Sequence, residues 1–303
     1  MKTYDLIIVG AGPAGMTAGI YAARSGLKTA IISKDIGGTT NSILMLENWP
    51  GFKGSGTELM KSFYNQLKEY EIDILMNDVE DIEKKGKYFI VKTKKQEFEC
   101  KALIIASGTE RKKLNIPGEK ELIGRGVSYC VTCDSFFFKG KIVAVIGGSD
   151  CAAISALALS DIAKKVYIFY KGEELRCEDI NSERLKNKEN VEIHYNSIPK
   201  EIKGEDKVEG LVVSHKGKER EYKVEGIFVE IGAVPLIDFV KKLGLRLNEN
   251  KCIVVDENMK TSVPGVFAAG DVNCTKLNQV VVASAEGAIA AKSAYSYIKD
   301  KEQ

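Results

Sequence analysis

The chain has 303 residues, 44% of them hydrophobic, and its 44 Lys and Arg nearly balance its 42 Asp and Glu, which gives a net charge of +2. This length predicts two domains at about 150 residues each, and the charge balance argues against binding to nucleic acid or to an anionic membrane. No apolar run reaches the roughly 18 residues of a membrane span, so we expect a soluble, cytoplasmic protein.

The first predicted unit is YDLIIVGAGPAGMTAGIYAARSGLKTAIIS, residues 4–33. It has the pattern of an apolar strand, a glycine-rich turn, a helix rich in small residues and a second strand, which is the βαβ unit that binds dinucleotides. Gly10 permits the tight turn, Gly12 lets the backbone approach a pyrophosphate, and Gly15 lets helix and strand pack closely. An acidic residue usually ends the second strand and binds a ribose. Ser33 occupies that position, and Asp35 lies nearby.

A Cys-x-x-Cys pair, Cys130 and Cys133, follows in the middle of the chain. Such a pair predicts either a zinc site or a redox site. No second Cys-x-x-Cys exists and His194 and His215 are distant in sequence, so we expect no metal. Two inert buried thiols are the third possibility. A redox pair needs a thiolate, which the N-terminus of a helix can stabilise, and the neighbouring Asp134 is a candidate acid/base.

A second βαβ unit, GKIVAVIGGSDCAAISALALSDIAKKVYIFY, covers residues 140–170. Gly147 and Ala152 fit the outer positions of the glycine fingerprint, but Ser149 replaces its middle glycine. Two such units predict an α/β protein with two doubly wound nucleotide-binding-type domains. Near the C-terminus, TSVPGVFAAGDV and NQVVVASAEGAIAAKSAYSYI predict a strand, a turn with Asp271, and a helix whose small residues face a packed neighbour.

Taken together, these segments resemble the low-molecular-weight flavoprotein thioredoxin reductases over essentially the whole chain. The motifs that carry the resemblance are GAGPAGMTAGIYAARSG, GGTTNSILMLENWPGF, IIASGTE, CVTCD, and GVFAAGDV followed by NQVVVASAEGAIAA. The resemblance implies a homodimer. It also implies a discontinuous FAD-binding domain, residues 1–114 and 232–303, split by an inserted redox-disulfide domain, residues 115–231, whose NAD(P)H-type fold is degenerate.

The resemblance also implies roles for individual residues. Cys133 receives electrons from the flavin, Cys130 attacks the disulfide of the substrate thioredoxin, and Asp134 transfers protons. Arg125, Phe136 and Phe137 match positions that meet thioredoxin, although the ring cluster 136–138 is equally compatible with a core. The implied FAD-binding residues are Gly10, Gly12, Pro13, Ala14, Gly15, Ser33, Gly38, Thr39, Asn48, Ala106, Ser107, Gly108, Gly270, Asp271, Asn278, Gln279 and Val280.

The electron donor depends on the second turn and on the segment that follows it. Family members that use NADPH carry His-Arg-Arg-x-x-x-Arg at the end of the next strand, where arginines clamp the 2′-phosphate. Here the segment is Tyr170-Lys171-Gly172-Glu173-Glu174-Leu175-Arg176. Together with Ser149, this departure is similar to the ferredoxin-dependent flavin thioredoxin reductases. We therefore expect reduced ferredoxin as the donor and no tightly bound NADPH.

Several alternatives stay open. Lys171 and Arg176 leave room for a reductase that uses NADPH or NADH. A flavin thiol oxidase, or a flavin redox sensor without turnover, would share the same motifs. A ferredoxin–NADP reductase is disfavoured because it needs no cysteine pair. The chain has seven cysteines, an odd count that does not predict a secreted disulfide framework. Five of them have no predicted role and are expected to be buried or incidental thiols: Cys100, Cys151, Cys177, Cys252 and Cys274.

Overall fold

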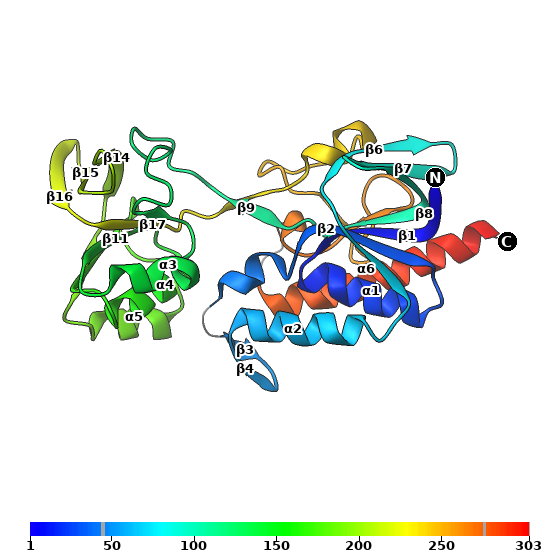
Figure 1. The fold of residues 1–303 in the computed structure, drawn as a ribbon, viewed down its shortest axis with the longest axis horizontal. Helices are drawn as coiled ribbons and strands as arrows, with labels where there is room; N and C mark the ends of the chain where they lie inside the picture. Colours follow the sequence, from blue (N-terminus) through cyan, green and yellow to red (C-terminus); the bar gives the residue numbers. More distant parts are fainter. Residues whose placement is uncertain (44–45, 275–276, 303) are drawn as a thin grey trace. The chain divides into compact units, whose positions relative to one another are not determined.

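The computed structural model describes residues 1–43, 46–274 and 277–302 (Figure 1). The chain divides into two compact units, one of Met1–Glu110 with Val234–Gln303 and one of Arg111–Ala233. The sequence places the two boundaries nearby, after residue 114 and before residue 232. The two crossing segments pair with each other as β9 (Thr109–Arg111) and β18 (Ala233–Pro235).

The first unit is built on a seven-stranded sheet in the order β5-β2-β1-β8-β7-β6, with β19 also paired to β8. Five strands run parallel to one another: β5, β2, β1, β8 and β19. The strand β7 is antiparallel to both of its neighbours, β8 and β6. The continuous apolar runs of β1 and β8 are typical of strands that are buried on both faces. The strands are β1 (Lys2–Ala11), β2 (Thr29–Ile36), β5 (Ile72–Met76), β6 (Val79–Lys85), β7 (Tyr88–Thr93), β8 (Glu97–Ile105) and β19 (Val266–Ala268).

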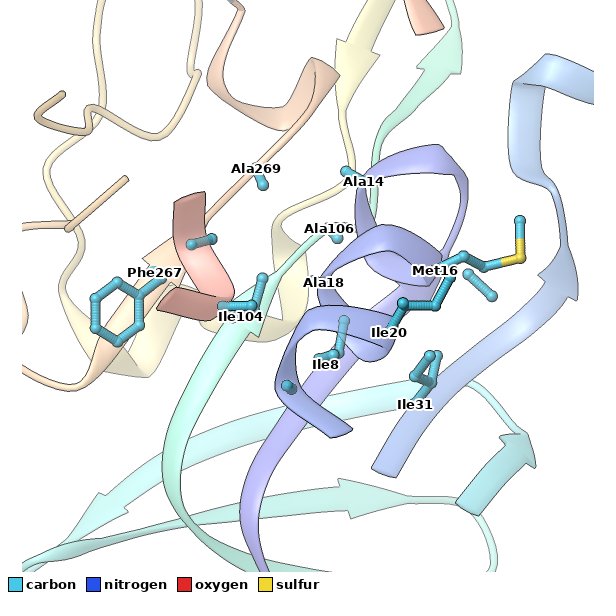
Figure 2. Packing of buried hydrophobic residues seen from close by; sticks show 14 of the residues in the cluster. Ile8, Ala14, Met16, Ala18, Ile20, Ile31, Ile104, Ala106, Phe267 and Ala269 are labelled. Carbon is cyan, nitrogen blue, oxygen red and sulfur yellow. The ribbon is translucent and has the colours of Figure 1, made fainter. Parts of the chain in front are cut away.

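Three helices pack on one face of this sheet: α1 (Pro13–Arg24), α2 (Gly56–Leu67) and α6 (Val280–Glu302). Their apolar side chains meet those of β1, β2 and β8 in one core, part of which is shown in Figure 2. Small residues let α1 and α6 approach closely, because a Cβ added to Gly287 would collide with the backbone carbonyl of Ala14. The prediction that the small residues of the C-terminal helix face a packed neighbour is therefore confirmed.

The second unit has a five-stranded parallel sheet in the order β10-β17-β11-β12-β13 and a separate antiparallel sheet, β14-β15-β16. The parallel strands are β10 (Val127–Ser128), β11 (Ile142–Ile146), β12 (Lys165–Phe169), β13 (Val191–His194) and β17 (Gly226–Val229). The antiparallel strands are β14 (Ser197–Lys203), β15 (Gly210–His215) and β16 (Lys218–Lys223). The helices are α3 (Val131–Asp134), α4 (Asp150–Ser160) and α5 (Asp179–Lys186), with the 3-10 turn η2 (Ser135–Phe138).

The first unit also contains a short antiparallel pair, β3 (Leu46–Trp49) and β4 (Phe52–Gly54), and three 3-10 turns, η1 (Gly38–Ser42), η3 (Asp238–Leu243) and η4 (Asp271–Asn273). The predicted α/β class is confirmed, since each unit contains a parallel sheet and the second unit is inserted between two segments of the first. Within the described residues, no helix has the length and apolar character needed to cross a membrane.

Candidate functional site

A cavity of about 550 Å³ lies at the carboxyl ends of β1, β2 and β8 in the first unit. This is where doubly wound sheets bind their ligands. Most of the predicted FAD-binding residues line it: Gly10, Gly12, Pro13, Ala14, Ser33, Gly38, Thr39, Ala106, Ser107, Gly108, Gly270, Asp271, Asn278, Gln279 and Val280. The cavity therefore brings together residues from both ends of the chain.

The glycine turn between β1 and α1 leaves its backbone accessible from the cavity. Gly10 has φ +108°, and a Cβ there would collide with the carbonyl of Ala106. A Cβ on Gly12 would meet no atom within 4 Å, so this residue faces open space. No side chain caps the N-terminus of α1. Its first N–H groups are available to a negatively charged ligand such as a pyrophosphate.

Two predicted residues lie outside the cavity lining. A Cβ on Gly15 would collide with the carbonyl of Gly10, so this glycine allows the close contact of α1 with the turn beneath the cavity. The side chain of Asn48 donates from Nδ2 to Oε1 of Gln279 at 2.6 Å. Asn48 therefore orients the side chain of Gln279, which lines the cavity.

At the end of β2, the hydroxyl of Ser33 is engaged by the chain itself. It donates to the carbonyl of Asp35 at 2.7 Å and accepts from the N–H of Ala11 at 3.1 Å. The proton of Ser33 is thus committed to Asp35 rather than to a ribose. The carboxylate of Asp35 lines the cavity and accepts from the N–H of Gly38 at 3.0 Å through Oδ1. Asp35 is the better candidate acceptor for a ribose hydroxyl.

On the C-terminal side of the cavity, a buried carboxylate fixes the backbone before η4. Glu286, which is only 6% exposed, accepts from the N–H of Gly270 at 2.7 Å and from Nδ2 of Asn273 at 3.2 Å. Burial raises the pKa of both Glu286 and the neighbouring Asp271 above their ordinary values. A carboxylate from α6 therefore holds the turn that presents Gly270 and Asp271 to the cavity.

The second unit carries the predicted redox pair. Cys130 and Cys133 form a disulfide with their Cα atoms 5.3 Å apart. Cys130 caps α3, and its sulfur accepts from the N–H of Cys133 at 3.2 Å. Cys133 is exposed and Cys130 is partly buried. The pair opens a helix as expected, but α3 is a single four-residue turn. The expected stabilisation by a helix dipole is correspondingly small, because a macrodipole builds up over several aligned turns.

Asp134 is linked to the cysteine pair through one serine. The hydroxyl of Ser128, a residue only 5% exposed, donates to Oδ2 of Asp134 at 2.6 Å and accepts from the N–H of Cys130 at 3.0 Å. This serine fixes the orientation of the Asp134 carboxylate relative to the Cys130 backbone.

The ring cluster that follows the pair divides into a surface part and a core part. Phe136 and Phe137 are 68% and 59% exposed, with their ring centroids 4.0 Å apart. Phe138 is buried and packs edge-on against Phe228. Arg125 is exposed. One ring of the cluster thus belongs to the core, and two rings form an exposed apolar surface on η2, the turn that follows α3.

The turn between β11 and α4 differs from the first turn. Ser149 is exposed and begins α4 at the position where Gly12 leaves open space. The ring of Tyr170, only 8% exposed, covers the backbone of Gly148, since a Cβ there would lie 2.5 Å from ring carbons. The N–H of Arg176 donates to the carbonyl of Gly148 at 2.6 Å. The hydrogen bond from Arg176 has a counterpart in the first unit, where the N–H of Gly37 donates to the carbonyl of Ala11 at 2.8 Å. The two turns therefore differ in the Tyr170 ring and in the side chain of Ser149.

Comparisons with known proteins match the whole chain. A family model described as pyridine nucleotide-disulphide oxidoreductase matches residues 4–287. The thioredoxin reductase of Bacillus subtilis is 40% identical, over 100% of this chain and 97% of that protein. The crystal structure of Lactococcus lactis thioredoxin reductase is 37% identical with a TM-score of 0.95, over 98% of this chain and 99% of that chain. A ferredoxin-flavin thioredoxin reductase from Clostridium acetobutylicum is 33% identical with a TM-score of 0.57, over 100% and 99% of the two chains.

The chain belongs to the thioredoxin reductase family. Membership in this family of pyridine nucleotide-disulphide oxidoreductases implies FAD. The residues of the first cavity fit this cofactor. The accessible backbone at Gly12 and the uncapped N-terminus of α1 suit a pyrophosphate, and Asp35 suits a ribose.

The cavity of the first unit also contains residues that the sequence analysis missed. Most of them lie at or near the ends of strands, and the others belong to or follow η1, η3 and α6, so a search of every strand end would have found several of them. They are Val9, Ala11, Ile32, Lys34, Thr40, Ile43, Asn77, Asp78, Val79, Thr109, Leu236, Phe239, Ala269 and Ala283.

One expectation about the remaining cysteines of this chain is wrong. Cys252 and Cys274 form a second disulfide, with their Cα atoms 5.6 Å apart, instead of being incidental thiols. The two residues are separated by 22 positions, and no local motif marks them. Cys100, Cys151 and Cys177 are free thiols.

Proposed function

We propose that the chain passes electrons through FAD and the Cys130–Cys133 disulfide to thioredoxin, with reduced ferredoxin as the electron donor and a homodimer as the working form. FAD, when bound, supplies a carrier that can accept single electrons and deliver them as a pair. Two reduced ferredoxins, each giving one electron, together with two protons convert the disulfide to a dithiol. The dithiol then reduces the disulfide of thioredoxin and returns to its oxidised form.

The protein's own groups have separate tasks in this proposal. Cys133 takes the electron pair, and Cys130 attacks the substrate disulfide as a thiolate. Asp134, oriented by Ser128, holds or releases the proton that accompanies each thiol. Phe136 and Phe137 offer an exposed apolar contact for thioredoxin, next to the reacting sulfurs.

The observation that carries the choice of donor is the contrast between the two matched turns. Gly12 faces open space and Ser33 is small, whereas Ser149 carries a side chain and the Tyr170 ring covers Gly148. A pyrophosphate needs close approach to the backbone at this turn. Of the phosphate clamp, only Lys171 and Arg176 are cationic, and the exposed Glu173 and Glu174 lie between them. This setting disfavours a nucleotide that carries a 2′-phosphate.

A nicotinamide-dependent thioredoxin reductase is the second candidate, and the comparisons favour it. The family model is named for pyridine nucleotides, and the relative named for ferredoxin is less similar than the relatives named thioredoxin reductase alone. Arg176 would then be the main phosphate contact. Its guanidinium carbon lies 5.8 Å from the centroid of the Tyr170 ring.

An anaerobic flavin titration tests the proposal. The oxidised holoenzyme is mixed separately with NADPH, NADH and reduced ferredoxin, and flavin absorbance is followed with and without thioredoxin. Bleaching by ferredoxin alone, followed by reoxidation when thioredoxin is added, is the expected result. Rapid bleaching by NADPH or NADH would overturn ferredoxin dependence and establish the second candidate.

A further inference from the structure

The second disulfide joins a buried sulfur to an accessible residue in the first unit. Cys252 is fully buried, whereas Cys274 is exposed. Cys252 lies in a tight turn, where its N–H donates to Oδ1 of Asn248 at 3.0 Å and its carbonyl accepts from the N–H of Asn248 at 3.0 Å. Cys274 ends η4, the turn that begins with the cavity residue Asp271. The disulfide thus ties a cavity element to a separate part of the chain.

We propose that Cys252–Cys274 is a second redox site of this protein, and that its reduction by a dithiol weakens the binding of FAD. FAD is the cofactor implied by the family. Any dithiol can be used to test whether the Cys252–Cys274 disulfide is reduced. Only the assignment of reduced thioredoxin as the natural reductant rests on the proposed function. Reduction by thioredoxin would make the flavin content of the enzyme respond to its own product.

The order of the thiol–disulfide exchange follows from the exposure of Cys274 and the burial of Cys252. A thiolate of the incoming dithiol attacks the sulfur of the exposed Cys274, and the sulfur of Cys252 leaves as a thiolate and takes up a proton. The second thiol of the dithiol then attacks the mixed disulfide and releases Cys274 as a thiol. Two electrons and two protons pass from the dithiol, which ends as a disulfide, to the cysteine pair. No further reactant is needed.

The effect on FAD follows from what holds η4 in place. On the side of α6, Glu286 binds the backbone of Gly270 and the side chain of Asn273. On the other side, η4 is tied to the turn at Cys252 by the disulfide and by the N–H of Ile253, which donates to the carbonyl of Val272 at 3.1 Å. Val272 is also buried in the same core cluster as Ile253, and Nδ2 of Asn273 donates to the carbonyl of Ala268 at 3.1 Å. Reduction removes the covalent link between η4 and the turn at Cys252 and leaves non-covalent contacts in its place.

The backbone conformation of Cys274 adds to this effect. Cys274 has φ +50°, a left-handed conformation that costs energy for a residue other than glycine. With the crosslink broken, Cys274 can relax to negative φ. We expect this relaxation to displace η4 and to move Asp271 away from the flavin.

The test uses the full chain with Cys130→Ser and Cys133→Ser, so that the outcome does not depend on whether the proposed electron transfer occurs. Five cysteines remain, three free and two in the second disulfide. The protein is equilibrated with dithiothreitol or with reduced thioredoxin, quenched in acid, unfolded and alkylated for mass spectrometry. Retained FAD is measured in parallel by ultrafiltration. We expect alkylation to rise from three cysteines to five, and the FAD dissociation constant to rise by roughly tenfold, within the usual range for coupled sites.

The matched control adds Cys252→Ser and Cys274→Ser to the same background. Its FAD affinity should equal that of the reduced protein and should not respond to dithiol. Alkylation that stays at three cysteines under conditions that fully reduce thioredoxin would overturn the redox site. Alkylation of five cysteines with unchanged FAD affinity would overturn the link to the flavin. The alkylation count and the FAD affinity of the Cys130→Ser, Cys133→Ser protein decide the proposal even if the variant that lacks all four cysteines does not fold. The reason is that the first protein keeps Cys252 and Cys274.

Discussion

Arg111 and Glu230 form an ion pair in which Nη1 of the arginine lies 2.7 Å from Oε2 of the glutamate. The glutamate side chain is only 4% exposed, and its other oxygen accepts from Oγ of Ser155 at 2.9 Å. Burial raises the pKa of Glu230, and the nearby Arg111 partly offsets this rise. The carbonyl of Glu230 also touches the second glycine turn, because a Cβ on Gly147 would collide with it. This pair therefore supports the second unit beneath that turn.

Replacing Arg111 with Leu should leave the Glu230 carboxylate buried without a cation. We expect a loss of about 3 kcal/mol in the free energy of unfolding. A raised pKa in the folded state means that the folded protein binds the proton more tightly than the unfolded one. The loss should therefore be greater at about pH 8 than at about pH 5, where Glu230 can protonate. Urea denaturation at the two pH values measures it.

Two control variants accompany Arg111→Leu. The double variant Arg111→Leu, Glu230→Gln removes both charges and should recover most of the stability at the higher pH. Lys188→Leu breaks a more exposed pair with Asp161 in the same unit, at 2.6 Å, and should cost less than about 1 kcal/mol. Equal losses for Arg111→Leu and Lys188→Leu would show that burial of Glu230 has no energetic weight.

The two glycine turns should respond oppositely to an added methyl group. Gly12→Ala meets no atom and has an extended backbone, so the apoprotein should fold normally, but FAD should bind at least about tenfold more weakly because the methyl group blocks the pyrophosphate. Gly148→Ala should cost about 1–3 kcal/mol, since the methyl group collides with the Tyr170 ring, and should leave FAD affinity unchanged. Thermal unfolding and FAD titration of both variants check this. The reverse assignment of the two effects would contradict it.

Cys133→Ser should reduce thioredoxin reduction by at least about 10³-fold, because the variant lacks the sulfur that takes the electron pair. FAD content should be unchanged, since Cys133 belongs to the second unit and the cavity is built from residues of the first. The measurement is steady-state reduction of thioredoxin with ferredoxin as the donor. Cys177→Ser removes a free thiol of the same unit and should retain full activity. Unimpaired turnover by Cys133→Ser would remove this residue from the reaction.

Glu286→Ala should weaken FAD binding by releasing the backbone at Gly270. The substitution leaves the N–H of Gly270 and the amide of Asn273 without their buried acceptor, at a cost of about 1–3 kcal/mol in the free energy of unfolding. Glu286→Gln keeps an oxygen acceptor and should retain most of the stability and affinity. Chemical denaturation with and without FAD distinguishes the two variants. Identical behaviour of the alanine and glutamine variants would show that the hydrogen bonds do not position the turn.

Local patterns in the sequence were enough to locate both βαβ units, the FAD-side turn and the redox pair. The reason is that a glycine turn between a strand and a helix imposes its requirements within about thirty residues. The same logic located Gly10, Gly12 and Gly15 and the substitution at Ser149. At the end of β2, the sequence left open whether Ser33 or Asp35 binds the ribose, and both residues line the cavity. The hydroxyl of Ser33 donates to the carbonyl of Asp35 and accepts from the N–H of Ala11, and hydrogen-bond partners of this kind have no sequence signature.

What the sequence by itself determined was the order of the elements, the class of fold and the position of the cysteine pair Cys130 and Cys133 at the start of a helix. Only the tertiary structure decided that Cys252 meets Cys274 across 22 positions, that the Tyr170 ring covers Gly148, and that Glu230 is paired with Arg111. The physical reason is the same for all three. Periodicity and turn residues act over short stretches of chain, whereas these contacts depend on how separate strands and turns are brought together by the packing of a core.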